Sequence, residues 1–390
     1  EEARLRESVI TTLKEVFSLY GFSPLETPAL EYAETLLSKY GKEADKLIYQ
    51  FRDRGGREVG LRYDLTVPLA RVIASYPTLP MPFKRYQIQP VWRAEKPQAG
   101  RYREFLQCDA DIVGTGSPIA DAEIIAMAVT ALKNLGFTDF KILVNDRNLF
   151  ADLPMETIII LDKLDKIGKD GVIAELVKKG YSQEKGKSLL SKIQTAKTTP
   201  SLEKIFSYLV KLGIEEKFYK FNPTLARGLE YYTGTIFEAQ IAGYPGGSVA
   251  GGGRFDKLIG MFIGKDIPAV GISFGIDRVI EALRQTGTLL ETKGASSAEV
   301  LVTVFDAKTL SYSLSIANRL RNAEISTEVY PDEETKLDKQ LKYADKKGIE
   351  WVVIVGPDEI KDKTITVKNM QTGEQKRVKE TSLIKYLPDV

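Results

Sequence analysis

The sequence has no histidine among its 390 residues, and this absence excludes several kinds of enzyme. A Ser-His-Asp triad, an imidazole general base and a zinc site with a histidine ligand are all impossible. The single cysteine, Cys108, excludes an internal disulfide and a thiolate zinc site, and it is typical of a reducing compartment such as the cytoplasm. An enzyme with this composition would use arginine, lysine, carboxylates, hydroxyls and oxygen-bound Mg²⁺, which suits phosphoryl-group chemistry.

Long apolar runs and a strong net charge are also missing. No run approaches the roughly 20 apolar residues that a membrane-spanning helix needs, so we expect no membrane partner. The first residues, EEARLRESVI, lack the pattern of a signal peptide, and without an initiator methionine we expect the chain to begin inside its gene product. The net charge is only +2, so any site for a polyanion must be a local patch.

Hydrophobic periodicity divides the chain into distinct parts. Residues 84–113 predict two strands around a loop, an antiparallel hairpin. Residues 150–220 are lysine-rich and amphipathic at helical period without a strand pattern, which indicates a helical insertion. From residue 298 onwards strands alternate with helices, which predicts a small α/β domain with a largely parallel sheet.

The predicted hairpin is unusually basic between residues 84 and 103. Its cations would repel one another unless an anion lies among them, and arginine suits bidentate contact with phosphate oxygens. These residues therefore favour a phosphate site, although a solvated basic edge strand is an alternative. The six cations, opposed by Glu95 alone, are Lys84, Arg85, Arg93, Lys96, Arg101 and Arg103.

Two glycine-containing motifs each allow two interpretations. The segment PGGSVAGGGRFD, residues 245–256, would let the backbone approach a ligand closely, or it would be a mobile hairpin turn. Arg278 follows Gly275 in the predicted first turn of a helix, where a cation opposes the helix dipole. An anion bound there would explain the arginine, and an ordinary surface arginine is the alternative.

Acidic residues gather in two further motifs. Asp64 and Thr66 precede an apolar helix, where they are typical of a helix cap. Gln107, Asp109 and Asp111 share one face of a strand, where acids are uncommon. Either a ligand cation or a salt bridge to the hairpin arginines would satisfy them.

Taken together, these motifs closely resemble the histidyl-tRNA synthetases, a family of class II aminoacyl-tRNA synthetases. The resemblance rests on FKRYQIQPVWRAEKPQAGRYREFLQCDADIVG, ARGLEYYTGTIFE and AVGISFGIDRVIEAL. YGFSPLETPALE looks like class II motif 1, the hairpin like motif 2, and the turn from Gly275 to Arg278 like motif 3. LRYDLTVP and QCDADIVG resemble the eukaryote- and archaeon-like branch.

The resemblance covers essentially the whole chain and implies an α+β protein. An antiparallel-sheet catalytic domain would span residues 1–145 and 221–290, interrupted by a helical insertion at 146–220. A linker at 291–297 would lead to a C-terminal α/β anticodon-binding domain at 298–390. The family's usual segment ahead of the first helix is missing.

The resemblance also implies partners. Gln98 would face the acceptor end of tRNA(His), and Lys361–Lys363 or Lys376–Lys379 are our guesses for contacts to the anticodon arm. A homodimer would form through the motif 1 region.

The family pattern assigns the ATP site to four residues. Arg93 would hold the α-phosphate, Glu95 would lie near the adenine amine, and Arg101 would approach the β- and γ-phosphates. Arg278 would clamp the ATP from above, with Mg²⁺ on the phosphates and no protein-held metal.

The same pattern assigns the site for the substrate L-histidine. Asp64 would receive the ammonium group, and Gln107 would contact the groups near the α-carbon. Asp111 and Tyr232 would bind the two imidazole nitrogens, because a pocket built to hydrogen-bond rejects ligands that lack those groups. The full set is Asp64, Leu65, Thr66, Gln107, Asp111, Tyr231 and Tyr232.

Arg227 would lie beside the substrate carboxylate and the α-phosphate, where it would stabilise the charge that grows during in-line attack. Together with Arg93 it would make the catalytic pair for histidyl-adenylate formation. Three alternatives compete with this interpretation. They are a synthetase-like regulator of the ATP phosphoribosyltransferase of histidine biosynthesis, a non-catalytic tRNA sensor, and a class II enzyme for glycine, threonine or proline.

Overall fold

The computed structural model describes residues 2–37, 48–94, 102–227, 231–288, 296 and 298–387. The chain divides into two compact units, a larger one of residues 2–290 and a smaller one of residues 291–390. Within the described ranges, no helix has the length and apolar character needed to cross a membrane.

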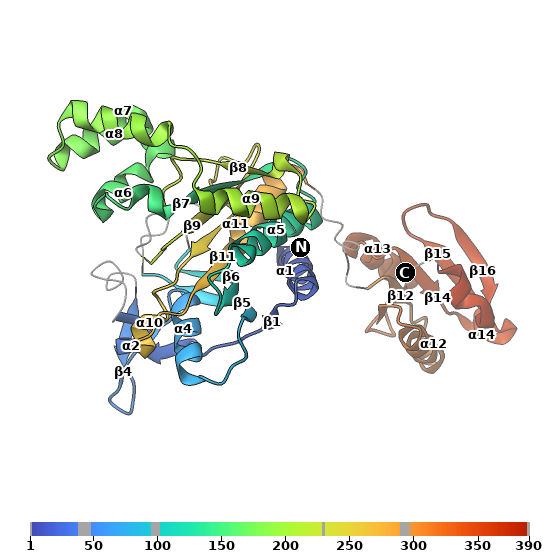
Figure 1. The fold of residues 1–390 in the computed structure, drawn as a ribbon. Coiled ribbons are helices and arrows are strands. Elements are labelled where there is room, and N and C mark those ends of the chain that lie inside the picture. The colour runs from blue at the N-terminus through green and yellow to red at the C-terminus, as the bar shows by residue number, and fades with distance from the viewer. Residues whose placement is uncertain are drawn as a thin grey trace. The chain divides into compact units, whose positions relative to one another are not determined.

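An eight-stranded sheet forms the centre of the larger unit (Figure 1). Its six inner strands pair antiparallel, and the two edge strands pair parallel to their neighbours. The predicted hairpin is confirmed as two ten-residue strands in direct antiparallel register. In spatial order the strands are β1 (Ser23–Pro24), β5 (Phe83–Trp92), β6 (Glu104–Val113), β11 (Ala269–Gly275), β10 (Ala250–Arg254), β9 (Thr235–Ile241), β7 (Phe140–Asp146) and β8 (Tyr219–Phe221).

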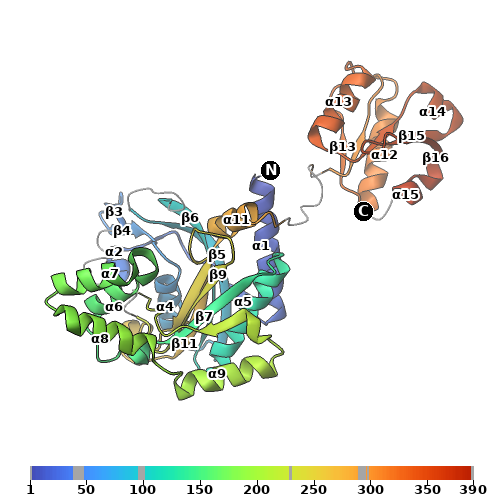
Figure 2. The ribbon, with the colours of Figure 1, turned by 90° about the horizontal axis from the view of Figure 1, so that it is seen from above.

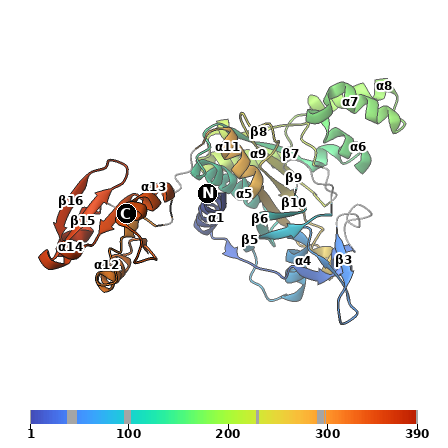
Figure 3. The ribbon, with the colours of Figure 1, turned by 180° about the vertical axis from the view of Figure 1, so that it is seen from behind.

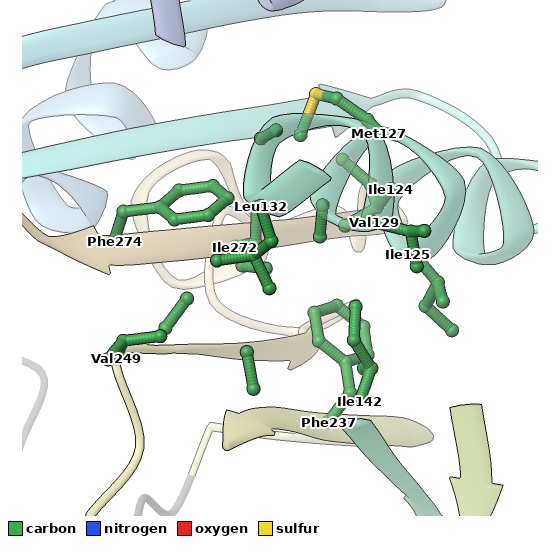
Figure 4. Close-up of a cluster of buried hydrophobic side chains, with 14 of the residues drawn as sticks. Ile124, Ile125, Met127, Val129, Leu132, Ile142, Phe237, Val249, Ile272 and Phe274 are labelled. Atoms are coloured by element: carbon green, nitrogen blue, oxygen red, sulfur yellow. The ribbon is translucent and has the colours of Figure 1, made fainter. Parts of the chain in front are cut away.

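Helices cover one face of this sheet and bury the main core there (Figure 2). Strand alternation turns Cys108, Ala110 and Ile112 of β6 toward these helices, because successive side chains point to opposite faces. Figure 4 shows Ile272 and Phe274 of β11 packing among apolar side chains of the helix Pro118–Asn134. The covering helices are α1 (Glu2–Leu19), α5 (Pro118–Asn134), α9 (Pro200–Lys211) and α11 (Ile276–Gln285).

The opposite face carries smaller elements. Asp64, Leu65 and the following helix pack beside the ends of β5 and β6, with Leu69 and Val113 in a shared apolar cluster. A three-stranded antiparallel sheet precedes this region in the sequence. These elements are β2 (Leu30–Tyr32), β4 (Glu58–Leu61), β3 (Tyr49–Arg52), α2 (Ala33–Leu37), α4 (Thr66–Ser75) and α10 (Gly260–Ile263).

The helical segment after β7 forms a small apolar cluster of its own at one end of the unit (Figure 3). This cluster unites η1 (Arg147–Phe150) with α6 (Met155–Leu161), α7 (Leu164–Lys178) and α8 (Gln183–Gln194). In contrast, Leu202, Ile205 and Leu209 of α9 belong to the main core. After η2 (Glu216–Phe218), the three-residue strand β8 pairs with β7, so the expectation of a strand-free segment is wrong at its end. A strand of three residues is too short to show periodicity.

The smaller unit has a five-stranded sheet of order β13-β12-β14-β15-β16. Strand β12 pairs parallel with β13 and β14, whereas β15 pairs antiparallel with both β14 and β16. The prediction of a largely parallel sheet is therefore wrong for its second half. After the short helix Pro357–Asp362 the chain returns antiparallel to β14 as β15, and β15 and β16 then form a hairpin. The elements are β12 (Val300–Val302), α12 (Leu310–Asn322), β13 (Thr327–Val329), α13 (Leu337–Lys347), β14 (Trp351–Ile354), α14 (Pro357–Asp362), β15 (Thr364–Asn369), β16 (Gln375–Lys379), η3 (Glu380–Ser382) and α15 (Leu383–Tyr386).

Candidate active site

One face of the central sheet is polar, and the strand register determines its layout. On β5 and β6, every second residue points away from the main core. Arg85 lies directly opposite Asp111, and Asp111 lies opposite Gly271 of β11. The polar residues on this face are Arg85, Gln87, Gln89, Gln107, Asp109, Asp111, Glu238 and Ser273.

A cavity of about 340 Å³ opens over this face. Three arginines from distant parts of the sequence line it: Arg93 after β5, Arg227 before β9 and Arg278 in the first turn of α11. Gln107 and Glu238 line it as well. The convergence of three guanidinium groups on one cavity fits a polyanionic ligand, since arginine binds phosphate and carboxylate oxygens well.

Arg227 is held by contacts on several sides. Its Nη1 donates to Oε1 of Glu238 at 2.9 Å, its guanidinium lies 5.6 Å from the ring centre of Tyr232, and its carbonyl accepts from Arg147. Its Nε is buried without a hydrogen-bond partner within the described part of the chain. The contacts to Glu238 and Tyr232 therefore pre-position the guanidinium at the cavity.

A hydrogen-bonded series connects Arg227 to Arg278. Glu238 accepts from the hydroxyl of Ser248, and the carbonyl of Ser248 accepts from Nη1 of Arg278 at 3.0 Å. Arg93 is fixed separately, by donating to the carbonyl of Tyr63 at 3.1 Å. The anion interpretation of Arg278 gains support from this arrangement, because its side chain lines the cavity.

The glycine-rich segment forms part of the turn between β9 and β10 and then β10 itself. Gly246 and Gly247 lie in the turn before β10, whereas Gly251, Gly252 and Gly253 form the centre of that strand. A Cβ on Gly253 would lie 2.9 Å from the ring of Tyr232. The absence of side chains at Gly251 and Gly253 therefore leaves room for the side chains of Arg227 and Tyr232 against the sheet.

Three buried carboxylates lie next to residues that line the cavity. Oδ1 of Asp64 accepts the N–H of Val67, so the cap interpretation is right even though Leu65 occupies the N-cap position itself. Burial raises the pKa of Asp64 to about 6. Leu65 and Thr66 are buried beside it.

Asp109 and Asp111 have different partners. Asp109 accepts from the amide of Gln107 at 3.0 Å, and Asp111 forms an ion pair of 2.7 Å with Arg85. The salt bridge to a hairpin arginine is therefore confirmed for Asp111. Burial raises the pKa of Asp111 to about 7, against the opposing effect of Arg85.

The tyrosine pair lies next to these acids. The ring centres of Tyr231 and Tyr232 are 4.6 Å apart, and Tyr231 meets the ring of Phe255 edge-on at 6.0 Å. Tyr232 is buried against Leu225 and Ile236. Two rings fixed in this way form a rigid wall for a small ligand.

Comparison with known proteins decides the family. A model described as histidyl-tRNA synthetase matches residues 1–167 and 171–279, and a model described as an anticodon binding domain matches residues 299–389. The chain belongs to the histidyl-tRNA synthetase family. Its larger unit therefore contains the family's synthetase domain, and its smaller unit contains the anticodon-binding domain.

Relatives extend this match over almost the entire chain. The histidine–tRNA ligase of Cytophaga hutchinsonii is 40% identical, covering 96% of this chain and 93% of the relative. That of Aeropyrum pernix is 42% identical, covering 95% and 91%. The crystal structure of histidyl-tRNA synthetase from Nostoc sp. PCC 7120 has a TM-score of 0.87 at 31% identity, covering 99% of this chain and 96% of that one. These identities do not test the eukaryote- and archaeon-like branch, which stays a prediction.

Most residues predicted for the synthetase site lie in one region, but the sequence did not suggest all of its members. Glu95, Gln98 and Arg101 fall outside the described residues. Glu238 lines the cavity although the sequence did not suggest a role for it, whereas Ser248 and Gly251 line it from the glycine-rich segment 245–256. The alternation of TIFEA places Glu238 on the polar face, and that signal could have found it.

Proposed function

We propose that this protein joins L-histidine to tRNA(His) in two steps, through histidyl-adenylate, with ATP as the second substrate. The observation that carries the proposal is the meeting of Arg93, Arg227 and Arg278 at one cavity beside buried Asp64 and Asp111. This arrangement offers cations for phosphates on one side and acceptors for an ammonium and an imidazole on the other.

In the first step a carboxylate oxygen of histidine attacks the α-phosphorus of ATP, and pyrophosphate leaves. Arg93 holds the α-phosphate, and Arg227 stabilises the charge that develops between the two reactants. Preorganised cations are effective here because they need no reorganisation as charge grows. Arg278 clamps the nucleotide, Glu95 contacts the adenine amine, and Arg101 meets the outer phosphates, where Mg²⁺ enters as part of the substrate.

Selection of histidine rests on the buried acids and the tyrosine pair next to the cavity. Asp64 and the turn that continues through Leu65 and Thr66 receive the ammonium, and Gln107 contacts the groups around the α-carbon. Asp111 and Tyr232 bind the imidazole nitrogens, and Tyr231 shapes the pocket wall. An amino acid without ring nitrogens would leave these buried groups unpaired, which is costly.

In the second step the terminal adenosine hydroxyl of tRNA attacks the activated carbonyl, with Gln98 near the acceptor end. The smaller unit, with bounds near 298–390, would read the anticodon arm. We propose the remaining bounds as predicted from the sequence: a catalytic domain of 1–145 and 221–290, an insertion at 146–220 and a linker at 291–297. Two chains would pair through the motif 1 region, and the protein would act in the cytoplasm.

Pyrophosphate–ATP exchange without tRNA, with each amino acid in turn, tests this function. Exchange with histidine alone is expected. Silence in a folded protein that still binds histidine would favour a regulator or a tRNA sensor, and exchange with another amino acid would contradict the roles of Asp111 and Tyr232.

A further inference from the structure

Arg85 is a buried cation for which neither the family match nor the proposed mechanism supplies a role. It lies in the middle of the sheet with none of its surface exposed. Its Nη2 lies 2.7 Å from Oδ2 of Asp111 and 3.4 Å from the carbonyl of Leu65, and its Nη1 donates to Gln87 at 3.2 Å. Arg85 therefore joins the strand that carries Asp111 to the turn that follows Asp64.

Asp111 has an asymmetric environment. Oδ2 faces Arg85, whereas Oδ1 lies over Gly271, where a Cβ would come within 1.8 Å of it. The ion pair with Arg85 thus orients Oδ2, and Oδ1 lies on the side of the glycine. A carboxylate held by one oxygen can use the other to accept a ligand N–H in a defined direction.

The charges around Asp111 are otherwise unfavourable. Asp109 projects from the same strand, and Asp64 approaches from the turn before α4. The facing position on β11 is Gly271, which carries no charge. Among the groups that act on Asp111 from the described elements, Arg85 alone favours its ionised form.

We propose that Arg85 is a positioning residue for histidine selection, which favours the ionised form of Asp111 and aims its second oxygen at the imidazole of the substrate. This inference rests on the proposed function and adds a residue to it. An ionised Asp111 accepts an imidazole N–H in a charge-assisted hydrogen bond. A protonated Asp111 would carry an O–H donor and offer only a weaker, neutral acceptor, which weakens the discrimination.

Removing Arg85 has a defined consequence for pH. An opposite charge at this distance lowers the pKa of a carboxylate by roughly 1–3 units, so Asp111 would titrate higher without it. The ionised fraction at neutral pH would then fall on the order of tenfold for each unit. KM for histidine would be raised most at low pH and would recover as the pH rises through the new pKa.

The test uses the full chain in pyrophosphate–ATP exchange from pH 5.5 to 9, with Arg85→Gln and Arg85→Lys. For Arg85→Gln we expect KM for histidine to rise on the order of 10–100-fold at pH 7, as for a lost hydrogen bond to a charged group. KM for ATP should stay near the wild-type value. Arg85→Lys should fall between the two, and it carries the test if Arg85→Gln does not fold.

Two controls separate this role from a structural one. Arg254→Lys alters another buried ion pair of the same sheet, with Asp121, and should leave the pH profile for histidine unchanged. A histidine analogue with a weakly basic ring, such as 2-fluorohistidine, removes titration of the substrate itself. Equal changes in KM for both substrates, or a profile that does not move, would overturn the proposal. Absence of exchange in the wild-type protein would instead contradict the proposed function.

Discussion

Arg227 lies so close to Gly251 that a Cβ at position 251 would come within 1.9 Å of its Nη1. The two residues come from different segments, the loop before β9 and the centre of β10. Gly251 therefore contributes to the site because it leaves space for the guanidinium of Arg227. Replacing Gly251 tests whether the position of that guanidinium affects the reaction rate.

Gly251→Ala should displace Arg227 and reduce the rate of adenylate formation about 100-fold, comparable to losing a donor to the developing charge. Single-turnover formation of histidyl-adenylate measures this rate. Gly116→Ala is a suitable control, because its nearest neighbour, Cγ of Pro268, would lie 3.8 Å away. A Gly251→Ala protein with the wild-type rate would show that the placement of Arg227 is not critical.

Arg227→Ala removes the guanidinium itself. We expect kcat for pyrophosphate–ATP exchange to fall by about 10²–10³, with KM for ATP little changed, because the charge acts mainly in the transition state. Arg284→Ala, which removes an exposed arginine 3.8 Å from Glu2, should leave exchange intact. An increase in KM with an unchanged kcat would instead assign Arg227 to ground-state binding.

Asp64→Asn should increase stability and abolish activity. The pKa of Asp64 in the folded state, about 6, lies above the ordinary value of 3.8 for an aspartate, so ionisation opposes folding. The stabilisation that protonated Asp64 gives to the folded state is complete below pH 4 and is lost as the pH rises through 6. Relative to wild type, the variant should gain roughly 1–3 kcal/mol in free energy of unfolding at pH 7.5 and nothing at pH 4.

Urea unfolding at the two pH values measures this difference. The control is Asp170→Asn on α7, where the side chain is exposed. An equal gain at both pH values would mean that Asp64 does not titrate as its burial predicts.

Lys376→Ala combined with Lys379→Ala tests the predicted contact between β16 and the anticodon arm of the tRNA. Both lysines are exposed on β16, and loss of two cations should lower kcat/KM for tRNA roughly tenfold, with a weaker salt dependence. Aminoacylation measures this, while exchange without tRNA should not change. The pair Lys339→Ala and Lys342→Ala removes two exposed charges from α13 as a control. Equal losses in both double variants would point to a general charge effect.

Local sequence determined several features of this protein. The absence of histidine limits the chemistry to arginines, acids and hydroxyls. The hairpin, the apolar helix that follows Asp64 and the alternation of strands with helices in the smaller unit follow from periodicity and turn residues. The motif segments also pointed to the family, because their order and identity are specific. Most residues assigned to histidine and ATP could be chosen from these motifs.

Only the tertiary structure decided which side chains meet. Periodicity shows which face of a strand is buried, but it does not show which strand lies beside it. The order β5-β6-β11-β10-β9 places Arg85 against Asp111 and Gly251 beneath Arg227, and it brings three arginines to one cavity. The same limit explains the mixed sheet of the smaller unit, since pairing direction is a property of two strands and their connection. The sequence alone therefore indicated which residues have the chemistry of the site, whereas long-range strand pairing decided which of them lie in contact.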